Sequence, residues 1–209
     1  MASEFIGQLL DFFSITGVLV FSVSGALFAA EKKMDILGFI LIGTVTGIGG
    51  GTLRDLLLGI SPVSWVQDPS LVYLCIVSSV MTYFTVGFYQ KRDAWILWLD
   101  AVGLIAFSVI GTQVALNHQL FPVIAIVMGV MTATFGGIMR DVLCAEVLTL
   151  MRPEMYITCA LLSSLVYILL HQLNINEGVT VICSFVSGFG LRAAAILFHL
   201  TLPRFNSEI

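Results

Sequence analysis

The stretch GIGGGTLRDLLLG at residues 47–59 places three consecutive glycines and an adjacent arginine and aspartate inside an apolar run. FGGIMRDVL at residues 135–143 repeats most of this pattern. Each glycine in a helix interior costs about 1 kcal/mol relative to alanine, and a buried charge must be paired to be tolerated. Both stretches therefore contain residues that an ordinary buried helix would avoid.

The composition is typical of an integral membrane protein. Of 209 residues, 58% are hydrophobic and 11% are charged, whereas about a quarter are charged in a soluble domain. Apolar runs near the bilayer-spanning length occur at residues 10–30, 36–59, 71–89, 94–115, 121–145, 155–173 and 178–200. The period-two alternation of a membrane β-barrel is absent. We therefore expect an all-α membrane protein, with seven transmembrane helices in a single domain over residues 1–209.

Several function classes are disfavoured by the same composition. A net charge of −4 leaves no basic surface for nucleic acid. No nucleophile and base stand at a spacing that favours an enzyme. Because the cysteines fall inside predicted spans without metal-ligand spacing, we expect neither a metal site nor a cofactor; these cysteines are Cys75, Cys144, Cys159 and Cys183.

The positive charges outside the spans predict the orientation. They all lie in the first, third and fifth loops or in the C-terminal tail: Lys32, Lys33, Lys91, Arg92, Arg152 and Arg204. The N-terminus and the alternate loops have none. Cytoplasmic loops carry the excess of Lys and Arg, so we expect the N-terminus outside and the C-terminus in the cytoplasm, in the plasma (inner) membrane.

An offset of 86 residues superposes the two motifs. Two predicted repeats follow, at about residues 10–89 and 94–173, with the helix at 178–200 outside them. Each repeat has three helices, so the second starts from the opposite side of the membrane and the pair is inverted. The superposed residues are Gly50 on Gly136, Gly51 on Gly137, Arg54 on Arg140 and Asp55 on Asp141.

The glycines have two interpretations. Their spacing of four residues favours close helix packing. Three in a row at Gly49, Gly50 and Gly51 go beyond that need and predict that the helix bends or unwinds, as it should more weakly at Gly136 and Gly137. Backbone carbonyls freed in this way would line a water-filled path. Hydroxyls expected along it are those of Ser22, Thr46, Ser108 and Thr132.

The charged residues are expected to shape this path. Neighbours in sequence do not face each other on a helix, so Arg54 is predicted to pair with Asp11 and Arg140 with Asp100. Asp55 and Asp141 would then lie nearer the path. An equal alternative is that these charges only clamp bent helices. Arg192 in the last span is expected to be a cation barrier, a lipid contact or a snorkelling residue.

These motifs, with SPVSW at residues 61–65 and LRAAAILFHLTLP at 191–203, resemble the prokaryotic trimeric intracellular cation channel family. The resemblance implies a homotrimer in the membrane lipid. Each subunit would hold a pore for potassium or sodium ions between the two repeats, with helices bent at the glycine motifs. Phe135 stands where the first copy has Gly49, so no second triplet is expected.

A secondary transporter of a small amino acid such as glycine is the alternative function, because it can use the same inverted repeats. If the protein is a channel, replacing Gly50 with leucine should block flux and leave the protein folded.

Overall fold

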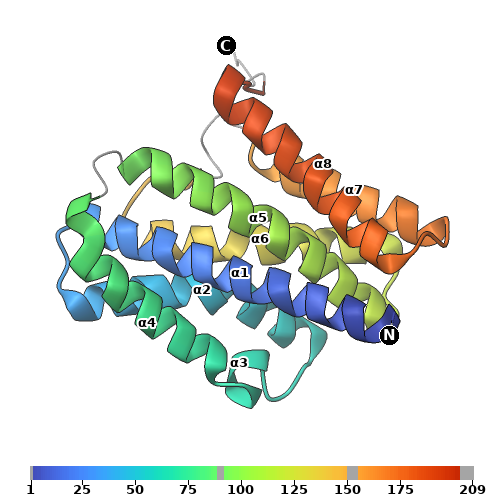
Figure 1. The fold of residues 1–209 in the computed structure, drawn as a ribbon, viewed down its shortest axis with the longest axis horizontal. Helices are drawn as coiled ribbons and strands as arrows, with labels where there is room; N and C mark the ends of the chain where they lie inside the picture. The colour runs from blue at the N-terminus through green and yellow to red at the C-terminus, as the bar shows by residue number, and fades with distance from the viewer. Residues whose placement is uncertain (1, 89–91, 150–154, 203–209) are drawn as a thin grey trace, which may run out of the picture.

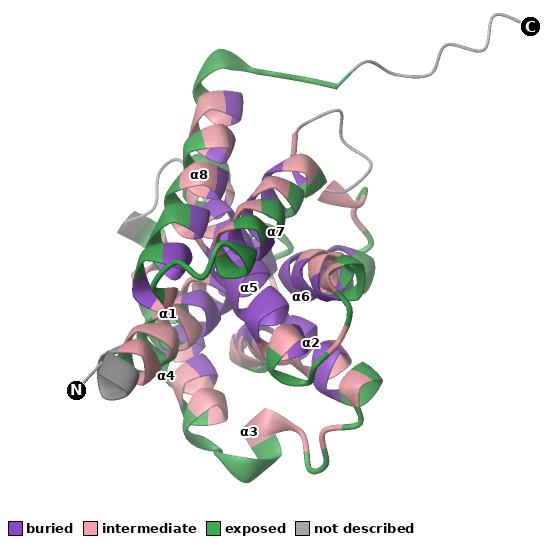
Figure 2. Cartoon of the chain, turned by 90° about the vertical axis from the view of Figure 1, so that its right-hand side faces the viewer, coloured by how far each residue is buried: buried purple, intermediate pink, exposed green. Residues whose placement is uncertain are grey.

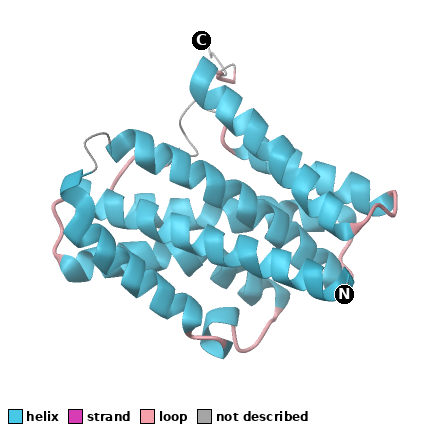
Figure 3. Ribbon diagram, in the orientation of Figure 1, coloured by secondary structure: helices cyan, strands magenta, loops and turns pink. Residues whose placement is uncertain are grey.

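The computed structural model describes residues 2–88, 92–149 and 155–202 as helices joined by loops (Figure 3). Seven of its helices coincide with the seven predicted runs to within a few residues at most ends. An eighth, α3, is a single turn between the second and third runs that the sequence did not predict. The bounds are α1 Ala2–Glu31, α2 Ile36–Leu58, α3 Ser64–Gln67, α4 Ser70–Thr85 with the 3-10 turn η1 Val86–Phe88, α5 Arg92–Asn117, α6 Pro122–Leu143, α7 Ile157–Gln172 and α8 Glu177–Phe198.

Local sequence signals begin and end the helices. The Asp35 carboxylate accepts the Gly38 amide at 2.8 Å at the start of α2, as an N-cap residue does. Gly59 ends α2 in the left-handed conformation, with φ 69°, where a side chain would be strained. Pro122 opens α6 in the first turn, where its missing N–H is not needed.

Five helices are long and apolar enough to cross a bilayer: α1, α2, α5, α6 and α8. The apolar helices α4 and α7 have 16 residues each, fewer than the roughly 20 that a straight span needs. The chain is therefore a multi-pass, all-helical membrane protein, in which two of the seven predicted spans are shorter than expected.

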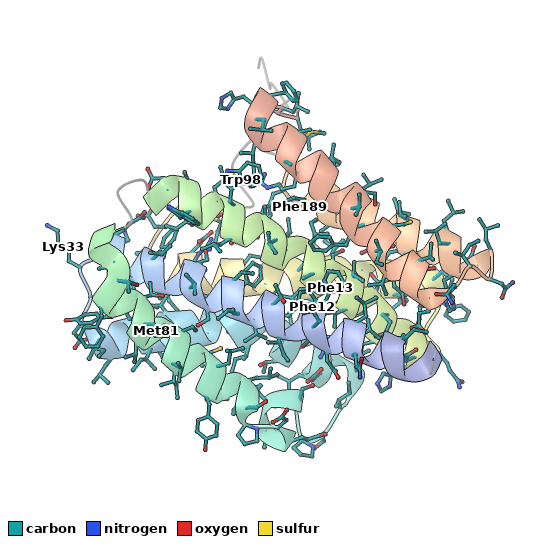
Figure 4. All side chains as sticks on the ribbon, viewed as in Figure 1. Phe12, Phe13, Lys33, Met81, Trp98 and Phe189 are labelled. Atoms are coloured by element: carbon teal, nitrogen blue, oxygen red, sulfur yellow. The ribbon has the colours of Figure 1, made fainter. Side chains whose placement is uncertain are left out.

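The helices α1, α2, α5 and α6 form the centre of the bundle. In this centre α1 packs on α5 and α2 on α6, while α4 packs on α1 and α2, and α7 on α5 and α6 (Figure 1). Buried residues concentrate where the central helices meet (Figure 2). The helix α8 packs on α7 and α5. Figure 4 shows Trp98 of α5 near Phe189 of α8, with ring centroids 6.3 Å apart.

Candidate functional site

Two cavities enter the bundle near opposite ends of α1. The first, here called the Arg54 cavity, has a volume of about 330 Å³ and lies beside the N-terminal half of α1. Its polar wall includes Asp11, Ser14, Thr52, Arg54, Asp55, Ser64 and Gln113. The second, the Arg140 cavity, has about 340 Å³ and lies at the C-terminal end of α1. Its polar wall consists of Glu31, Asp93, Asp100, Arg140, Glu146, Thr149 and Arg192.

An apolar layer separates the two cavities. Phe21, Leu104 and Ala133 are fully buried in one core cluster and line neither cavity. The Phe21 ring packs on that of Phe107, with centroids 5.3 Å apart, and Phe107 forms part of the wall of the Arg54 cavity. Buried apolar side chains therefore lie between the two cavities along α1, since Val18 lines the first, Phe28 lines the second and Phe21 lines neither.

The predicted unwinding of the glycine motifs is wrong. The helix α2 is continuous over Ile36–Leu58 and α6 over Pro122–Leu143. A Cβ atom on Gly50 would lie 2.1 Å from the carbonyl oxygen of Thr132, and one on Gly136 would lie 2.4 Å from that of Thr46. These two glycines let α2 and α6 cross with their backbones in contact, which is the close-packing interpretation.

The remaining motif glycines have other neighbours. Gly49 lies against the Met139 sulfur and lines an apolar groove between α2 and α6. A Cβ on Gly51 would find only the Arg54 Nη2 atom, at 3.9 Å, and Gly51 lines the Arg54 cavity. A Cβ on Gly137 would lie 3.7 Å from the Arg140 Nη2 atom. Gly51 and Gly137 therefore leave space beside the two motif arginines.

The four hydroxyl residues predicted for the path line neither cavity. Ser22 donates to a carbonyl of α4 at 3.2 Å, and Ser108 donates to a carbonyl of α7 at 2.7 Å. Thr46 and Thr132 each donate at 2.6 Å to the carbonyl four residues earlier in their own helix, a common arrangement for threonine in apolar helices. All four are buried in helix packing.

The two arginines do contact their sequence neighbours, contrary to the prediction. Arg54 donates from Nε and Nη2 to Asp55 Oδ1, at 2.9 and 2.7 Å. The side chains leave the helix in different directions, but the arginine is long enough to fold back onto the carboxylate. The other oxygen of Asp55 accepts the backbone amide of Ser64 at 2.8 Å. Asp55 therefore anchors the loop after α2 and is not free for a permeant ion.

Arg140 is the most highly connected charge in the described part of the chain. It donates to Asp141 at 2.9 Å and to Asp100 at 2.8 Å, the latter being the partner expected from the sequence. Its guanidinium also lies 4.6 Å above the centroid of the Phe28 ring. Asp141 in turn accepts the backbone amide of Thr149 at 2.7 Å. One arginine thus joins α1, α5, α6 and the loop after α6.

The predicted pairing of Arg54 with Asp11 does not form among the described residues, although both line the Arg54 cavity. The 86-residue offset places Ser14, not Asp11, at the position of Asp100. Asp11 lies almost one turn nearer the N-terminus and is exposed.

Arg192 is buried, and the prediction that it snorkels to lipid is wrong. Its exposed fraction is 1%. Its guanidinium lies 5.3 Å above the centroid of the Tyr156 ring, a favourable cation–π position, and it lines the Arg140 cavity. Arg192 therefore contributes a positive charge to this cavity.

Sequence analysis missed Ser64, Thr149 and Tyr156. Ser64 at the start of α3 and Thr149 after α6 donate to the motif aspartates, nine and eight residues further along the chain. The one available signal was a hydroxyl residue at a similar distance after each Arg-Asp pair, and hydroxyl residues are too common for that spacing to be diagnostic. Tyr156 carried no sequence signal, since it becomes a neighbour of Asp100 and Arg140 only through tertiary packing.

A surface ion pair includes one residue of the Arg140 cavity wall, Glu146. The Lys32 ammonium, just after α1, donates to Glu146 in the loop after α6. This hydrogen bond raises the pKa of Lys32 above its ordinary value. The pair is therefore present at neutral pH, and it is lost as the pH rises through this raised pKa.

We expect Lys32 to react several-fold more slowly than the adjacent, exposed Lys33 with an amine-acylating reagent at mildly alkaline pH, because only the neutral amine reacts. Mass spectrometry of labelled peptides measures both sites in one sample. The difference should disappear in Glu146→Gln. Equal rates in the unmodified protein would show that the pair does not persist in solution.

The chain is similar to known proteins in both sequence and structure. The sequence profile of a family described as "Glycine transporter" matches residues 11–86 and, separately, residues 97–172. The structure is similar to a trimeric intracellular cation channel orthologue from Rhodobacter sphaeroides, with a TM-score of 0.90 and 44% identity over 92% of this chain and 100% of that chain. The chain belongs to the trimeric intracellular cation channel family.

Other members of the trimeric intracellular cation channel family are also similar. A structure from work on conductance through these channels has a TM-score of 0.87 and 32% identity, over 95% of this chain and 98% of that chain. An inner membrane protein of Escherichia coli K12, YadS, is 38% identical over 95% of this chain and 97% of its own length. These relatives are channels and membrane proteins, so the chain is not an enzyme.

Proposed function

We propose that this protein is a channel for monovalent cations, chiefly potassium, with the ion path inside each subunit. The path runs from the Arg54 cavity, through the apolar layer, to the Arg140 cavity. The observation that carries this proposal is the placement of two cavities, each with charged residues in its wall, on either side of buried apolar side chains. Relatives described as cation channels support it. No bound cofactor is needed.

The charges of the cavities favour cations. The wall of the Arg140 cavity has four carboxylates, on Glu31, Asp93, Asp100 and Glu146, against two guanidinium groups and the Lys32 ammonium that pairs with Glu146. The Arg54 cavity has two carboxylates against one guanidinium. An excess of one sign in a narrow space raises the local concentration of the opposite ion. Both ends of the path should therefore attract cations and repel anions.

The unbroken helices limit the selectivity that we expect. Selective potassium filters replace the hydration shell with rings of backbone carbonyls. In α2 and α6 the helix is continuous, so its interior carbonyls are occupied by helical hydrogen bonds. Potassium and sodium should therefore both permeate, with modest discrimination between them.

We propose that the fold has seven spans, built from two inverted repeats and α8. The family profile matches the chain twice, with starting residues 86 apart, and the glycine contacts of α2 and α6 are reciprocal. Both features support duplication. The short helices α4 and α7 span if the bilayer thins locally around them.

Assembly and orientation complete the proposal. A homotrimer is supported by relatives described as trimeric channels. The distribution of Lys and Arg supports an external N-terminus and a cytoplasmic C-terminus, in the inner membrane as for YadS. A C-terminal fusion to an enzyme that is active only in the periplasm should be inactive, and activity there would reverse the orientation.

Planar-bilayer recording of the purified protein in a potassium gradient tests the function. We expect unitary currents that reverse near the potassium equilibrium potential. Absence of current, together with saturable glycine uptake into liposomes from the same preparation, would reject the channel and establish the transporter.

The apolar layer should be the barrier to flux. In Phe107→Ala the ring facing the Arg54 cavity is removed, so we expect a several-fold higher potassium flux, because a shorter apolar constriction wets more readily. Phe39→Ala is the matched control, since Phe39 is equally buried but packs on Tyr83 away from both cavities. Equal flux in the two variants would place the barrier elsewhere.

A further inference from the structure

The wall of the Arg54 cavity is mostly apolar, which a path for hydrated cations does not require. Its large apolar side chains include Leu10, Val18, Ile48, Leu71, Phe107 and Ile110. The Arg140 cavity is lined mostly by charged and polar residues instead. Sites for small organic molecules are typically cavities of about 300–1,000 Å³ with hydrophobic walls and a few placed polar groups. The Arg54 cavity, with a volume of about 330 Å³, has this size and this kind of wall.

Most polar groups in this wall are already used within the protein. The polar wall residues that form side-chain hydrogen bonds in the described part of the chain are Thr52, Arg54, Asp55, Ser64 and Gln113. Asp11 and Ser14 also line the cavity, and neither side chain forms a hydrogen bond or an ion pair with another described residue. One carboxylate and one hydroxyl therefore remain available to a ligand.

These two groups share one face of α1. Asp11 and Ser14 are three residues apart, and side chains at that spacing are neighbours on a helix. Asp11 belongs to the apolar stretch Ile6–Glu31 that is long enough to cross a bilayer. An ionisable residue in such a stretch is costly and commonly has a functional role. Asp11 and Ser14 therefore form a small polar patch on an otherwise apolar wall.

The charge of the cavity favours a cationic ligand. Arg54 does not make the wall positive, because it donates from Nε and Nη2 to Asp55 Oδ1 at 2.9 and 2.7 Å. The carboxylate of Asp11 is left in excess. Trp65 and Phe107 are also in the wall, and the faces of aromatic rings attract ammonium groups. A ligand with an ammonium group and an apolar chain would satisfy both parts of the wall.

We propose that the Arg54 cavity binds a protonated alkylamine. Its ammonium group donates to the Asp11 carboxylate and the Ser14 hydroxyl, and its alkyl chain lies against the apolar wall. The site itself is argued from the cavity alone. Its consequence rests on the proposed function: a bound amine occupies the external end of the ion path and lowers the potassium current.

The second repeat has no equivalent site. At the 86-residue offset, Leu97 stands in place of Asp11 and Asp100 in place of Ser14. Both line the Arg140 cavity, but Leu97 has no polar group and Asp100 accepts from Arg140 at 2.8 Å. The amine should therefore bind at one end of the path only.

Binding is tested with hexylammonium chloride and the purified full-length protein in lipid nanodiscs. Replacing Trp95 and Trp98 with phenylalanine leaves Trp65, in the cavity wall, as the one tryptophan of the chain. Near neutral pH the amine is protonated, as a lysine side chain is. We expect its addition to change the Trp65 fluorescence in a saturable way. The uncharged 1-hexanol and the anionic hexanoate should produce no saturable change at the same concentrations.

Asp11→Asn is the decisive variant, and its exposed position makes it compatible with folding. We expect a roughly tenfold higher half-saturating concentration, as for loss of a hydrogen bond to a charge. Asp68→Asn is the matched control, because Asp68 is exposed in the loop after α3 and does not line the cavity. In the unmodified site, each methylene added between butylammonium and hexylammonium should lower the half-saturating concentration roughly threefold.

Three outcomes would overturn the site: no saturable change with hexylammonium, equal half-saturation in Asp11→Asn and Asp68→Asn, or equal binding of 1-hexanol. Potassium currents from the same preparation are measured separately. Currents without amine binding reject the site and leave the channel intact. Amine binding in a preparation that conducts no current supports the site and rejects the channel.

Discussion

Replacing Gly50 with alanine is expected to destabilise the folded protein strongly. A single methyl group there would lie 2.1 Å from the carbonyl oxygen of Thr132, and that oxygen belongs to the backbone of α6, which cannot rotate away as a side chain does. The helices α2 and α6 would have to separate along their crossing. Overpacking in a well-packed core costs about 1–3 kcal/mol and occasionally more, and a backbone clash of this depth belongs at the upper end.

Gly51→Ala is the matched control, because its new methyl group would meet only an arginine nitrogen at 3.9 Å. Gly136→Ala should resemble Gly50→Ala, since it clashes with Thr46. Yield of monodisperse protein by size exclusion, and its melting temperature, measure all three variants. Wild-type stability of Gly50→Ala would contradict the crossing. The sequence predicted that Gly50→Leu would block flux and leave the protein folded. Because even a Cβ at Gly50 clashes with the Thr132 carbonyl, we now expect Gly50→Leu to prevent folding.

Arg140→Gln is expected to be the most destabilising charge substitution. The arginine has an exposed fraction of 1% and neutralises two buried carboxylates, on Asp100 and Asp141. Removing one partner of a buried ion pair typically costs about 3–5 kcal/mol, because the other charge is left without compensation. In Arg140→Gln two buried carboxylates would be left without compensation. The loop that Thr149 holds to Asp141 would also be weakened.

Arg54→Gln provides the comparison within the same chain. Arg54 is 8% exposed, lines a cavity and contacts one carboxylate, Asp55, which keeps its bonds from Ser64. We expect a smaller loss of melting temperature in Arg54→Gln than in Arg140→Gln. Asp100→Asn combined with Arg140→Gln should recover part of the loss. Equal losses from the two arginine variants would contradict the unequal burial of the two sites.

The sequence was a good guide to elements and a poor guide to contacts. Hydrophobic runs predicted seven of the helices to within a few residues at most ends, because a membrane span needs a continuous apolar stretch that local composition reveals. The loop helix α3 was missed, since a single turn leaves no periodic signal.

The site shows the same division. The repeated Arg-Asp motif predicted that Arg54 and Arg140 belong to the site, and both line cavities. It also led to the correct pairing of Arg140 with Asp100. The rule that sequence neighbours do not face each other failed at Arg54 and Asp55, because it describes Cβ directions and not the reach of a long side chain. Of the predicted path hydroxyls, Ser22 and Ser108 instead join helices within a half of the bundle, and the two threonines bond to their own helices.

From its sequence alone, this protein is determined to be an all-helical membrane protein with two related glycine and Arg-Asp motifs, because composition and repeated letters are local properties. Tertiary structure decided that Gly50 and Gly136 serve a helix crossing, that Arg192 is buried, and that Tyr156 lies beside Asp100. These facts depend on which helices approach one another and how closely. Such distances arise from packing between segments far apart in the chain, which no local pattern records.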